Sequence, residues 1–434
     1  MPNKYDYKRK VDHTLTSDHP AVKELTDRLL NEIEYYRGEP FRNRKQYLAN
    51  LTDIILNLFV AVAWDQDLYV AYSRNASHYK THSRYNKTGI GYTPYVTLVD
   101  ALEEREYVEA KHGFKYEDVS RAPVMKATAK LLRQFGLSDF DKKMIRRERE
   151  LVVLKEPKRK DGYKPLKEFA DKPMTNRMRR NVAKINAQIA SSDIWLELSP
   201  SDRQNLKKRY KSGATDKLPF DDTATTLYRV FNDGDWKRGG RFVGHYIQSV
   251  PKAYRRMLTI DDEPVCEMDF SGMHLNALYL RAGLPRPVDD VYTLPGQSSE
   301  VRDTMKTYVN VILNSTGRQQ AINAIRSDIN AFDELSKAEK RQKTEEIKSL
   351  LDQFETKHAP ISQHFYTGVG LSLMHDESVI GEGVMLRLAK RGITCLPIHD
   401  SFITQARHNS LLKCIMEEES MALYGSALIV KPSW

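Results

Sequence analysis

The stretch "RGITCLPIHDSFITQ" (residues 391–405) decides the interpretation of the fold, because it places a carboxylate within an apolar segment. The apolar run 393–398 is interrupted by His399 and Asp400, and apolar character resumes at Phe402. A buried carboxylate without a partner either costs several kcal/mol or gives up its charge. Asp400 is therefore expected to have a bound cation, a partner group or a turn that accounts for its position.

Length and charge narrow the class of protein. A chain of 434 residues exceeds the usual size of a single core, so we expect two or three domains. The 68 Lys and Arg residues exceed the 58 Asp and Glu residues, which gives a formal net charge of +10. Such a balance favours a polyanionic partner, most often nucleic acid, although many soluble proteins are equally basic without binding one.

The sequence also predicts where the protein does not reside. It contains no uninterrupted apolar run of about 18 residues, so we expect no membrane span. The N-terminal segment "MPNKYDYKRKVDHTLTSD" lacks the apolar region of a secretory signal. Three widely separated cysteines match neither a disulfide framework nor a zinc site. These features predict a cytoplasmic protein.

The distribution of charge and the periodicity of apolar residues divide the chain into three predicted parts. Residues 1–137 predict a mainly helical module whose order of helices and hairpin resembles a winged helix, a nucleic-acid-binding fold. Residues 138–226 form a Pro-punctuated basic region, read either as a flexible linker or as a connector that contacts phosphates. Residues 227–434 alternate apolar strands with helices, so the chain as a whole is expected to be α+β.

A second isolated carboxylate matches Asp400. In "CEMDFSGMH" (residues 266–274), Asp269 ends an apolar strand just before a Ser-Gly turn into a helix. Two such strands lying side by side could hold divalent cations between their carboxylates. Two metal ions about 3.5–4 Å apart clamp the attacking and leaving oxygens of a phosphoryl displacement. Capping or turn roles are commoner for such aspartates, so the pair alone is weak evidence.

The order of the motifs is more specific, because it resembles the palm of family-A DNA polymerases and single-subunit, phage-type RNA polymerases. In that superfamily one motif supplies Asp before a Ser-containing turn, and a later one supplies His-Asp in a β-hairpin. The matching segments, in chain order, are "GGRFVGHYIQSVP" (239–251), "RRML" (255–258), "MDFSGMHLNALY" (268–279), "DDVYTLPG" (289–296), "VRDTMK" (301–306) and "IHDSF" (398–402). The resemblance covers about half the chain and implies a palm with a small antiparallel sheet.

The resemblance implies roles for individual residues. Asp269 and Asp400 would be catalytic and hold two Mg²⁺ ions, with Mn²⁺ as the alternative, and the carbonyl of Phe270 would add an oxygen ligand. Arg302 and Lys306, one helical turn apart, would grip the incoming nucleoside triphosphate. The residues expected to contact the template–primer duplex or the primer terminus are Arg241, Gln248 and His399.

The chain also departs from the family pattern. The finger helix usually carries an aromatic residue two turns after its Lys, but Asn314 falls there, so Tyr308 is the expected substitute. His274 occupies the position that is Glu in the DNA enzymes and small in the RNA enzymes. Only 131 residues (400 − 269) separate the two aspartates, so we expect reduced helical fingers.

The sequence therefore predicts a template-directed nucleotidyltransferase that extends a 3′-OH, with DNA and nucleoside triphosphates as partners and no membrane. "DFS" and the Gln-Ser-Val-Pro segment slightly favour DNA synthesis, whereas "HDSF" and the missing Glu favour RNA synthesis by a single-subunit RNA polymerase or primase. A second alternative is a non-catalytic replication initiator built on a decayed palm. A third is a metal-dependent nuclease. Such an organisation would suit a phage, plasmid or other mobile element.

Overall fold

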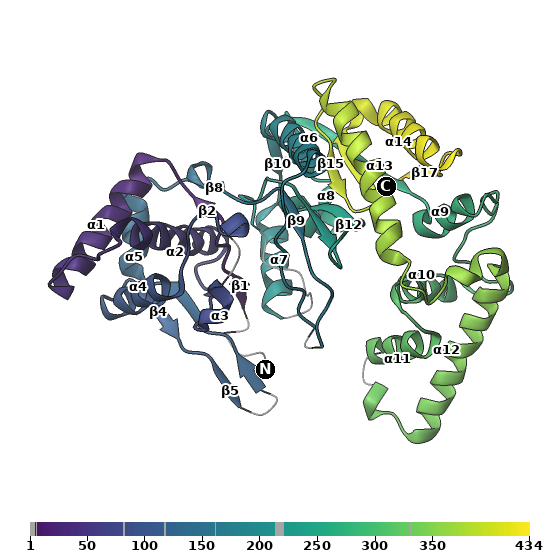
Figure 1. The fold of residues 1–434 in the computed structure, drawn as a ribbon, viewed down its shortest axis with the longest axis horizontal. Helices are drawn as coiled ribbons and strands as arrows, with labels where there is room; N and C mark the ends of the chain where they lie inside the picture. The colour runs from purple at the N-terminus through teal and green to yellow at the C-terminus, as the bar shows by residue number, and fades with distance from the viewer. Residues whose placement is uncertain are drawn as a thin grey trace.

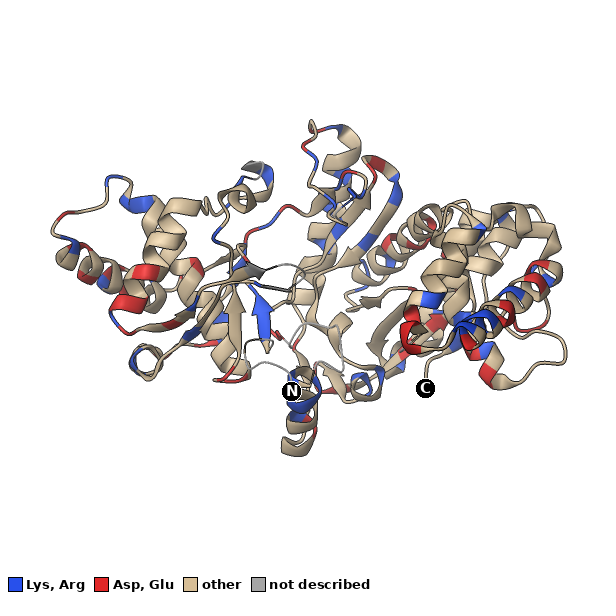
Figure 2. Cartoon of the chain, turned by 90° about the horizontal axis from the view of Figure 1, so that it is seen from below, with Lys and Arg blue, Asp and Glu red and all other residues tan. Residues whose placement is uncertain are grey.

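The computed structural model describes residue 5 and residues 7–80, 83–116, 119–160, 162–212, 221–329 and 332–434. The molecule is elongated, with the N-terminal helices at one end and sheets in the middle (Figure 1). The other end holds helices α10 (Ser299–Asn314), α11 (Arg318–Asp328) and α12 (Lys337–Lys357). Helices and mostly short strands are mixed along the chain, which confirms the predicted α+β class. Lys and Arg occur along the whole length with Asp and Glu between them (Figure 2), so the positive excess is not gathered at one end.

The N-terminal part packs three long helices against a small sheet whose strand order is β1-β3-β7-β4. The apolar residues of α2 are buried, and they pack against α1 and α4. The elements are β1 (Lys8–Lys10), β2 (Leu15–Thr16), α1 (Pro20–Arg37), α2 (Arg44–Trp64), β3 (Tyr69–Ala71), α3 (Ala76–Tyr79), α4 (Tyr92–Glu104), β4 (Val108–Lys111), β5 (Phe114–Tyr116), β6 (Val119–Arg121), β7 (Val124–Ala127) and α5 (Ala129–Leu137).

Among the described helices, α2 is the one whose length and composition would allow it to cross a membrane. Its side chains Leu51, Ile54, Ile55 and Leu58 are instead fully buried inside the protein. A helix that is apolar on nearly all sides is expected either in a membrane or in the centre of a core. In this structure α2 is the central helix of the N-terminal core.

The middle region, residues 138–226, contributes one strand to each of two sheets that are completed by C-terminal strands. Strand β9 (Val152–Leu154) pairs in parallel with β11 (Tyr228–Asn232), and β10 (Ile194–Leu196) pairs antiparallel with β13 (Leu258–Ile260). Its remaining elements are β8 (Arg146–Arg147), α6 (Pro173–Ala190) and α7 (Pro200–Lys211). The sheets therefore extend across residue 226, where the sequence suggested a domain boundary, and the flexible-linker reading does not hold for these paired strands.

The C-terminal half is organised by an antiparallel sheet of order β10-β13-β14-β16-β15, with β17 also paired to β14. Helices α13 and α14 pack against each other, α13 packs on β12, and α14 packs on β14. The bounds are β12 (Asp235–Val243), α8 (Lys252–Arg255), β14 (Glu263–Phe270), α13 (Gly370–Ala389), β15 (Leu396–Ile398), β16 (Ser401–Gln405), α14 (Asn409–Tyr424) and β17 (Val430–Pro432).

A separate apolar core holds the helices inserted between the two aspartates. It includes Leu278, Met305, Ile325 and Leu351, which come from four successive helices. These helices are α9 (Met273–Arg281), α10 (Ser299–Asn314), α11 (Arg318–Asp328) and α12 (Lys337–Lys357). The larger core, by contrast, is continuous from the N-terminal helices into the antiparallel sheet.

Candidate active site

Strand pairing brings Asp269 and Asp400 together. Strands β14 and β16 run antiparallel with Asp269 opposite Ser401, and the amide of Phe270 donates a hydrogen bond to the carbonyl of Asp400 at 3.4 Å. Asp400 lies in the short loop between β15 and β16, and not within either strand. The two carboxylates therefore sit on neighbouring segments at the same end of the sheet, as the sequence led us to expect.

The loop that carries Asp400 has an unusual backbone. His399 has φ 57°, in the left-handed region that side-chain-bearing residues seldom occupy. The tight β15–β16 hairpin, in which Ile398 pairs with Ser401, imposes this conformation. Strain of this kind persists where the surrounding structure fixes it, and it is commonly found at functional sites. The imidazole of His399 is exposed beside Arg241 and Glu377.

The charges around the two carboxylates do not balance them. Burial and the nearby Asp400 raise the pKa of Asp269 to about 7, although Lys306 and Lys252 oppose the shift. Burial, followed by the charge of Glu377, also raises the pKa of Asp400. Each carboxylate thus makes the other harder to ionise, and a bound cation would relieve both effects.

Glu377, a third carboxylate near the pair, is already neutralised. Arg241 donates two hydrogen bonds to it, at 2.7 and 2.6 Å, and Nε2 of His274 lies 3.2 Å from its second oxygen. Burial alone would raise the pKa of Glu377, but His274 and Arg241 together hold it below its ordinary value. Glu377 therefore anchors Arg241 and His274 and is not an open metal ligand.

Two glycines allow Arg241 to reach Glu377. Gly239 and Gly240 both have positive φ, of 78° and 90°, where the register of β12 against β11 shifts. A Cβ atom on Gly240 would lie 2.6 Å from the Phe231 ring. Only glycine can adopt this conformation without strain at such close packing. The "GGR" segment is thus a bulge that directs Arg241 toward α13.

The finger-like helix α10 brings one basic residue close to the carboxylates. Lys306 lowers the pKa of Asp269, which places it within electrostatic range of that carboxyl. Arg302 instead forms ion pairs with Asp290 and Asp303, both at 2.8 Å, and lies 5.7 Å from the centre of the Tyr292 ring. Arg302 is therefore linked to the site through Tyr292 and not through the aspartates.

Tyr292 is a site residue that the sequence interpretation missed. Burial, then the charges of Asp400, Asp290 and Asp269, raise the pKa of its hydroxyl. Its ring also lies 3.8 Å from where a Cβ of Gly272, in the turn after Asp269, would be. The signal was present in "DDVYTLPG", which resembled a family element, but no role was assigned to the tyrosine.

Tyr308 and Asn314, which the sequence assigned to nucleotide binding, contact other parts of the protein in this structure. Tyr308 packs against the helical core, and its electrostatic neighbours are Lys343 and Glu346 of α12. Residues two apart on a helix do not share a face, so Tyr308 cannot accompany Lys306 toward the carboxylates. Asn314 is exposed, and its amide donates to the carbonyl of Asn310 in its own helix at 2.8 Å.

The prediction that Gln248 contacts the template–primer duplex is also corrected. Its amide nitrogen donates to the carbonyls of Phe242 and Pro397, at 2.9 and 3.1 Å, and its oxygen accepts from the amide of Gly244 at 3.0 Å. Both donor hydrogens are thus used within the protein. Gln248 braces β12 against the strand that leads into the His399–Asp400 loop.

Glu377 was missed as well, although the sequence carried a signal. It shares the buried face of α13 with Leu373, Ile380 and Val384. An acidic residue on an otherwise apolar stripe is unusual and indicates a buried partner. The sequence could not show that the partners are Arg241 and His274, which are distant along the chain.

The donor set suits magnesium. In the described ranges, no group of three or more His, Cys, Asp or Glu residues forms a ready-made metal cluster. Asp269 and Asp400 supply carboxylate oxygens, and Mg²⁺ typically binds one or two carboxylates while keeping waters and substrate phosphates as its other ligands. These residues could thus hold a metal together with a phosphorylated substrate.

Comparison with known proteins adds no assignment. No family model matches the chain, and no curated protein matches it significantly. The resemblance to polymerases therefore depends on the ordered motifs and on the geometry described above.

Proposed function

We propose that the protein is a template-directed nucleotidyltransferase that adds nucleotides to a 3′-OH. The observation that carries this proposal is the pairing of β14 with the β15–β16 hairpin, which sets Asp269 and Asp400 side by side with too little positive charge to balance them. The antiparallel sheet serves as the palm, and α10 to α12 serve as reduced fingers.

The carboxylates bind the metal ions. Asp269 and Asp400 are the ligands, and the carbonyl of Phe270 is a further oxygen at the same strand end. Bound Mg²⁺ would supply electrostatic stabilisation of the attacking and leaving oxygens in phosphoryl transfer. The raised pKa of Asp269, about 7, describes the carboxyl without that charge beside it.

The neighbouring side chains bind the nucleotide and the primer end. Lys306 neutralises charge on the triphosphate, and Arg302 adds a second cation after exchanging its partner Asp290. Tyr292 provides an aromatic surface beside the two carboxylates. His399 and the Arg241–Glu377–His274 group flank the hairpin, where the primer terminus and the sugar of the incoming nucleotide would lie.

The N-terminal module is proposed to resemble a winged helix. Strands β3, β7 and β4 are adjacent in that order, and the β5–β6 hairpin connects β4 to β7. However, α4 contains no Lys or Arg and carries Asp100, Glu103 and Glu104. Phosphate repels such a helix, so nucleic acid is better contacted by the hairpin, where Arg121 lies over the exposed Phe114 ring.

DNA synthesis stays slightly favoured over RNA synthesis by a single-subunit polymerase or primase. Ser401, the residue that resembles the RNA enzymes, donates a hydrogen bond to buried Glu267 at 2.8 Å. Because its hydroxyl is engaged with Glu267 inside the sheet, Ser401 carries little weight for choosing the sugar. His274, which is held by Glu377, is the better candidate for that choice.

Extension of a labelled primer on a DNA template with magnesium tests the proposal. Parallel reactions contain dNTPs, NTPs, or NTPs without a primer. We expect Asp400→Asn and Asp269→Asn to reduce incorporation by about 10²–10³-fold or more, since each removes charge that stabilises the transition state. Asp262→Asn, an exposed change in the turn just before β14, is the matched control.

The outcomes separate the alternatives. Extension lost in both site variants and kept in the control supports a polymerase, and the preferred nucleotide identifies the product. Strand cleavage in place of extension would indicate a nuclease. Tight DNA binding without turnover by all four proteins would leave a non-catalytic initiator.

A further inference from the structure

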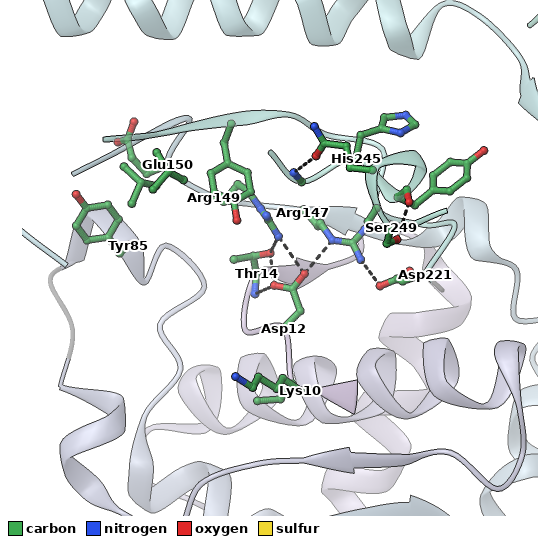
Figure 3. Close-up of a pocket in the computed structure, with 18 of the residues that line it drawn as sticks. Lys10, Asp12, Thr14, Tyr85, Arg147, Arg149, Glu150, Asp221, His245 and Ser249 are labelled. Atoms are coloured by element: carbon green, nitrogen blue, oxygen red, sulfur yellow. Dashed lines mark hydrogen bonds and ion pairs between the residues drawn. The ribbon is translucent and has the colours of Figure 1, made fainter. Parts of the chain in front are cut away.

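A cavity of about 660 Å³ lies between the N-terminal module and the sheets, away from the two catalytic carboxylates. Its walls come from β1 and the following loop, from the segment around β8 and β9, and from the 3₁₀ turn 246–249 (Figure 3). Ligand sites of 300–1,000 Å³ are commonly found where two parts of a protein meet. The motif segment 239–251 reaches the cavity through residues 244–249, but no residue of the proposed catalytic site lines it.

The lining is basic. Among the described residues, five Lys or Arg and three Asp or Glu line the cavity. Arg147 and Arg149 bind Asp12, at 2.9 and 3.0 Å, and Arg147 also binds Asp221, at 2.8 Å (Figure 3). Arg9 binds Asp221 as well, at 3.0 Å. Asp12 and Asp221 are thus already neutralised by arginines that line the cavity. The third carboxylate of the lining, Glu150, is neutralised by arginines outside it.

Two lysines of the lining differ from these arginines in their partners. In the part of the chain that the structure describes, Lys10 and Lys155 line the cavity without a carboxylate partner. Burial, and then the neighbouring Lys164, lowers the pKa of Lys155. An anion in the cavity would be attracted to both ammonium groups and would restore the protonated form of Lys155.

Arginine N–H groups add unfilled donors. Nη1 of Arg9 and Nε of Arg149 are buried and have no hydrogen-bond acceptor within the described residues. A buried donor without an acceptor is costly and requires an explanation. Phosphate oxygens are strong acceptors for such groups.

Aromatic rings complete the lining. The hydroxyl of Tyr85 donates to the carbonyl of Lys167 at 2.8 Å and accepts from the amide of Leu154 at 3.2 Å, which fixes the ring at the wall. Tyr228, also in the lining, is stacked under Arg149 at 4.7 Å. Basic side chains interleaved with fixed aromatic rings are the usual means of binding single-stranded nucleic acid.

We propose that this cavity binds a nucleotide unit, with its phosphate at Lys10 and Lys155 and its base against Tyr85. The unit belongs either to a single-stranded nucleic acid or to a free nucleotide. Gln248 lines the cavity and also braces the strand before His399, so the cavity adjoins the back of the catalytic hairpin. If the proposed polymerase function holds, a strand in this cavity is an unpaired template segment outside the active site.

Binding without catalysis tests the proposal. Fluorescence anisotropy with a labelled eight-nucleotide oligo(dT), in EDTA, compares the full chain with Lys10→Ala/Lys155→Ala. Each lost phosphate contact on a single strand lowers the salt slope of log K by about 0.7, so the double variant, which loses the one phosphate held by both lysines, should lower it by about 0.7. A matched variant, Lys337→Ala/Lys390→Ala, alters exposed lysines outside the cavity and should leave the slope unchanged.

A second measurement locates the base. Oligo(dT) carrying 5-iodouracil is photo-crosslinked, and the modified peptide is identified by mass spectrometry. We expect the crosslink at Tyr85 or Tyr228. We also expect Tyr85→Leu to weaken binding by about tenfold or more and Tyr85→Phe to retain most of it, because the ring supplies the stacking.

Competition by dTTP distinguishes the two sources. Displacement of the oligonucleotide crosslink at micromolar dTTP indicates a free-nucleotide site, and its absence indicates a strand site. Unchanged salt slope in Lys10→Ala/Lys155→Ala, with crosslinks confined to residues outside the cavity, would overturn the proposal. Asp400→Asn should crosslink normally, so failure of the polymerase proposal and failure of the cavity proposal give different results.

Discussion

Two pairs of buried or half-buried carboxylates lie in opposite electrostatic settings. Asp12 and Asp221, between the N-terminal module and the sheets, are surrounded by arginines. Burial alone would raise their pKa values, but those arginines hold both below the ordinary range. Asp269 and Asp400 have no ion pair of their own in the described structure, and their pKa values are raised.

The difference separates a structural pair from the pair for which we propose a function. Because arginines of the folded protein already pair with Asp12 and Asp221, this first pair forms a fixed junction that needs no ion from solution. The second pair is left short of positive charge, which a metal ion and its substrate can supply. A buried acidic residue thus says little by itself, and its partners decide which role it has.

Removing one partner of the junction should have the largest effect on stability. We expect Asp12→Ala to lower the free energy of unfolding by about 3–5 kcal/mol, because it leaves Arg147 and Arg149 buried without their shared carboxylate. Asp269→Ala should leave it unchanged or raise it in magnesium-free buffer. Urea unfolding followed by circular dichroism measures both. Equal losses in the two variants would remove the contrast between the pairs.

Magnesium should stabilise the folded protein only by binding to Asp269 and Asp400. At a concentration 100 times its dissociation constant, Mg²⁺ should add about 2.7 kcal/mol to the free energy of unfolding of the wild type. We expect no such gain in Asp269→Asn and the full gain in Asp12→Asn. Thermal melting with and without magnesium provides the measurement. Stabilisation that survives in Asp269→Asn would place the metal elsewhere.

Acid should weaken the junction. The pKa values of Asp12 and Asp221 in the folded protein are lowered. The two carboxylates therefore contribute their full stabilisation at pH values above the pKa of an unfolded Asp, about 3.9, and lose it as the pH falls below that pKa. Each carboxylate changes the slope of stability against pH by at most about 1.4 kcal/mol per unit. Melting temperatures of wild type and Asp12→Asn between pH 6 and 3 measure this. A wild-type curve no steeper than that of the variant would argue against the junction.

The smallest expected effect concerns Ser401. Its hydrogen bond to Glu267 is intramolecular and buried, so Ser401→Ala should cost about 1 kcal/mol of stability. The ratio of dNTP to NTP incorporation should stay the same. His274→Ala, in contrast, should change that ratio if the imidazole lies beside the sugar. A changed ratio in Ser401→Ala would restore the serine as a determinant of product type.

The sequence predicted the elements nearest the chemistry because their signals are local. The apolar runs around Asp269 and Asp400 predicted strands, and the alternation of strands and helices predicted the α+β class. Lys306 lies within electrostatic range of Asp269, and its role in binding a triphosphate stays a prediction. For Tyr308, the helical period alone places the side chain on a different face of the helix from Lys306, since two residues correspond to more than half a turn.

The rest depended on contacts between distant segments. Arg241 and Glu377 are 136 residues apart, and nothing local in either segment shows that they pair. Gln248 looked like a free polar residue because its acceptors, backbone carbonyls, leave no trace in side-chain identity. The arginine-rich segment around Arg147 resembled a solvated linker, because charge composition does not reveal that Asp12 lies opposite.

The pairing of β9 and β10 with C-terminal strands affects how the chain unfolds. Each supplies the partner of a C-terminal strand from outside residues 227–434. A fragment cut at residue 226 would expose the unpaired backbone of β11 and β13, which invites association with other chains. The C-terminal half is thus not an autonomous unit, and unfolding should proceed as one cooperative transition and not as the separate melting of two halves.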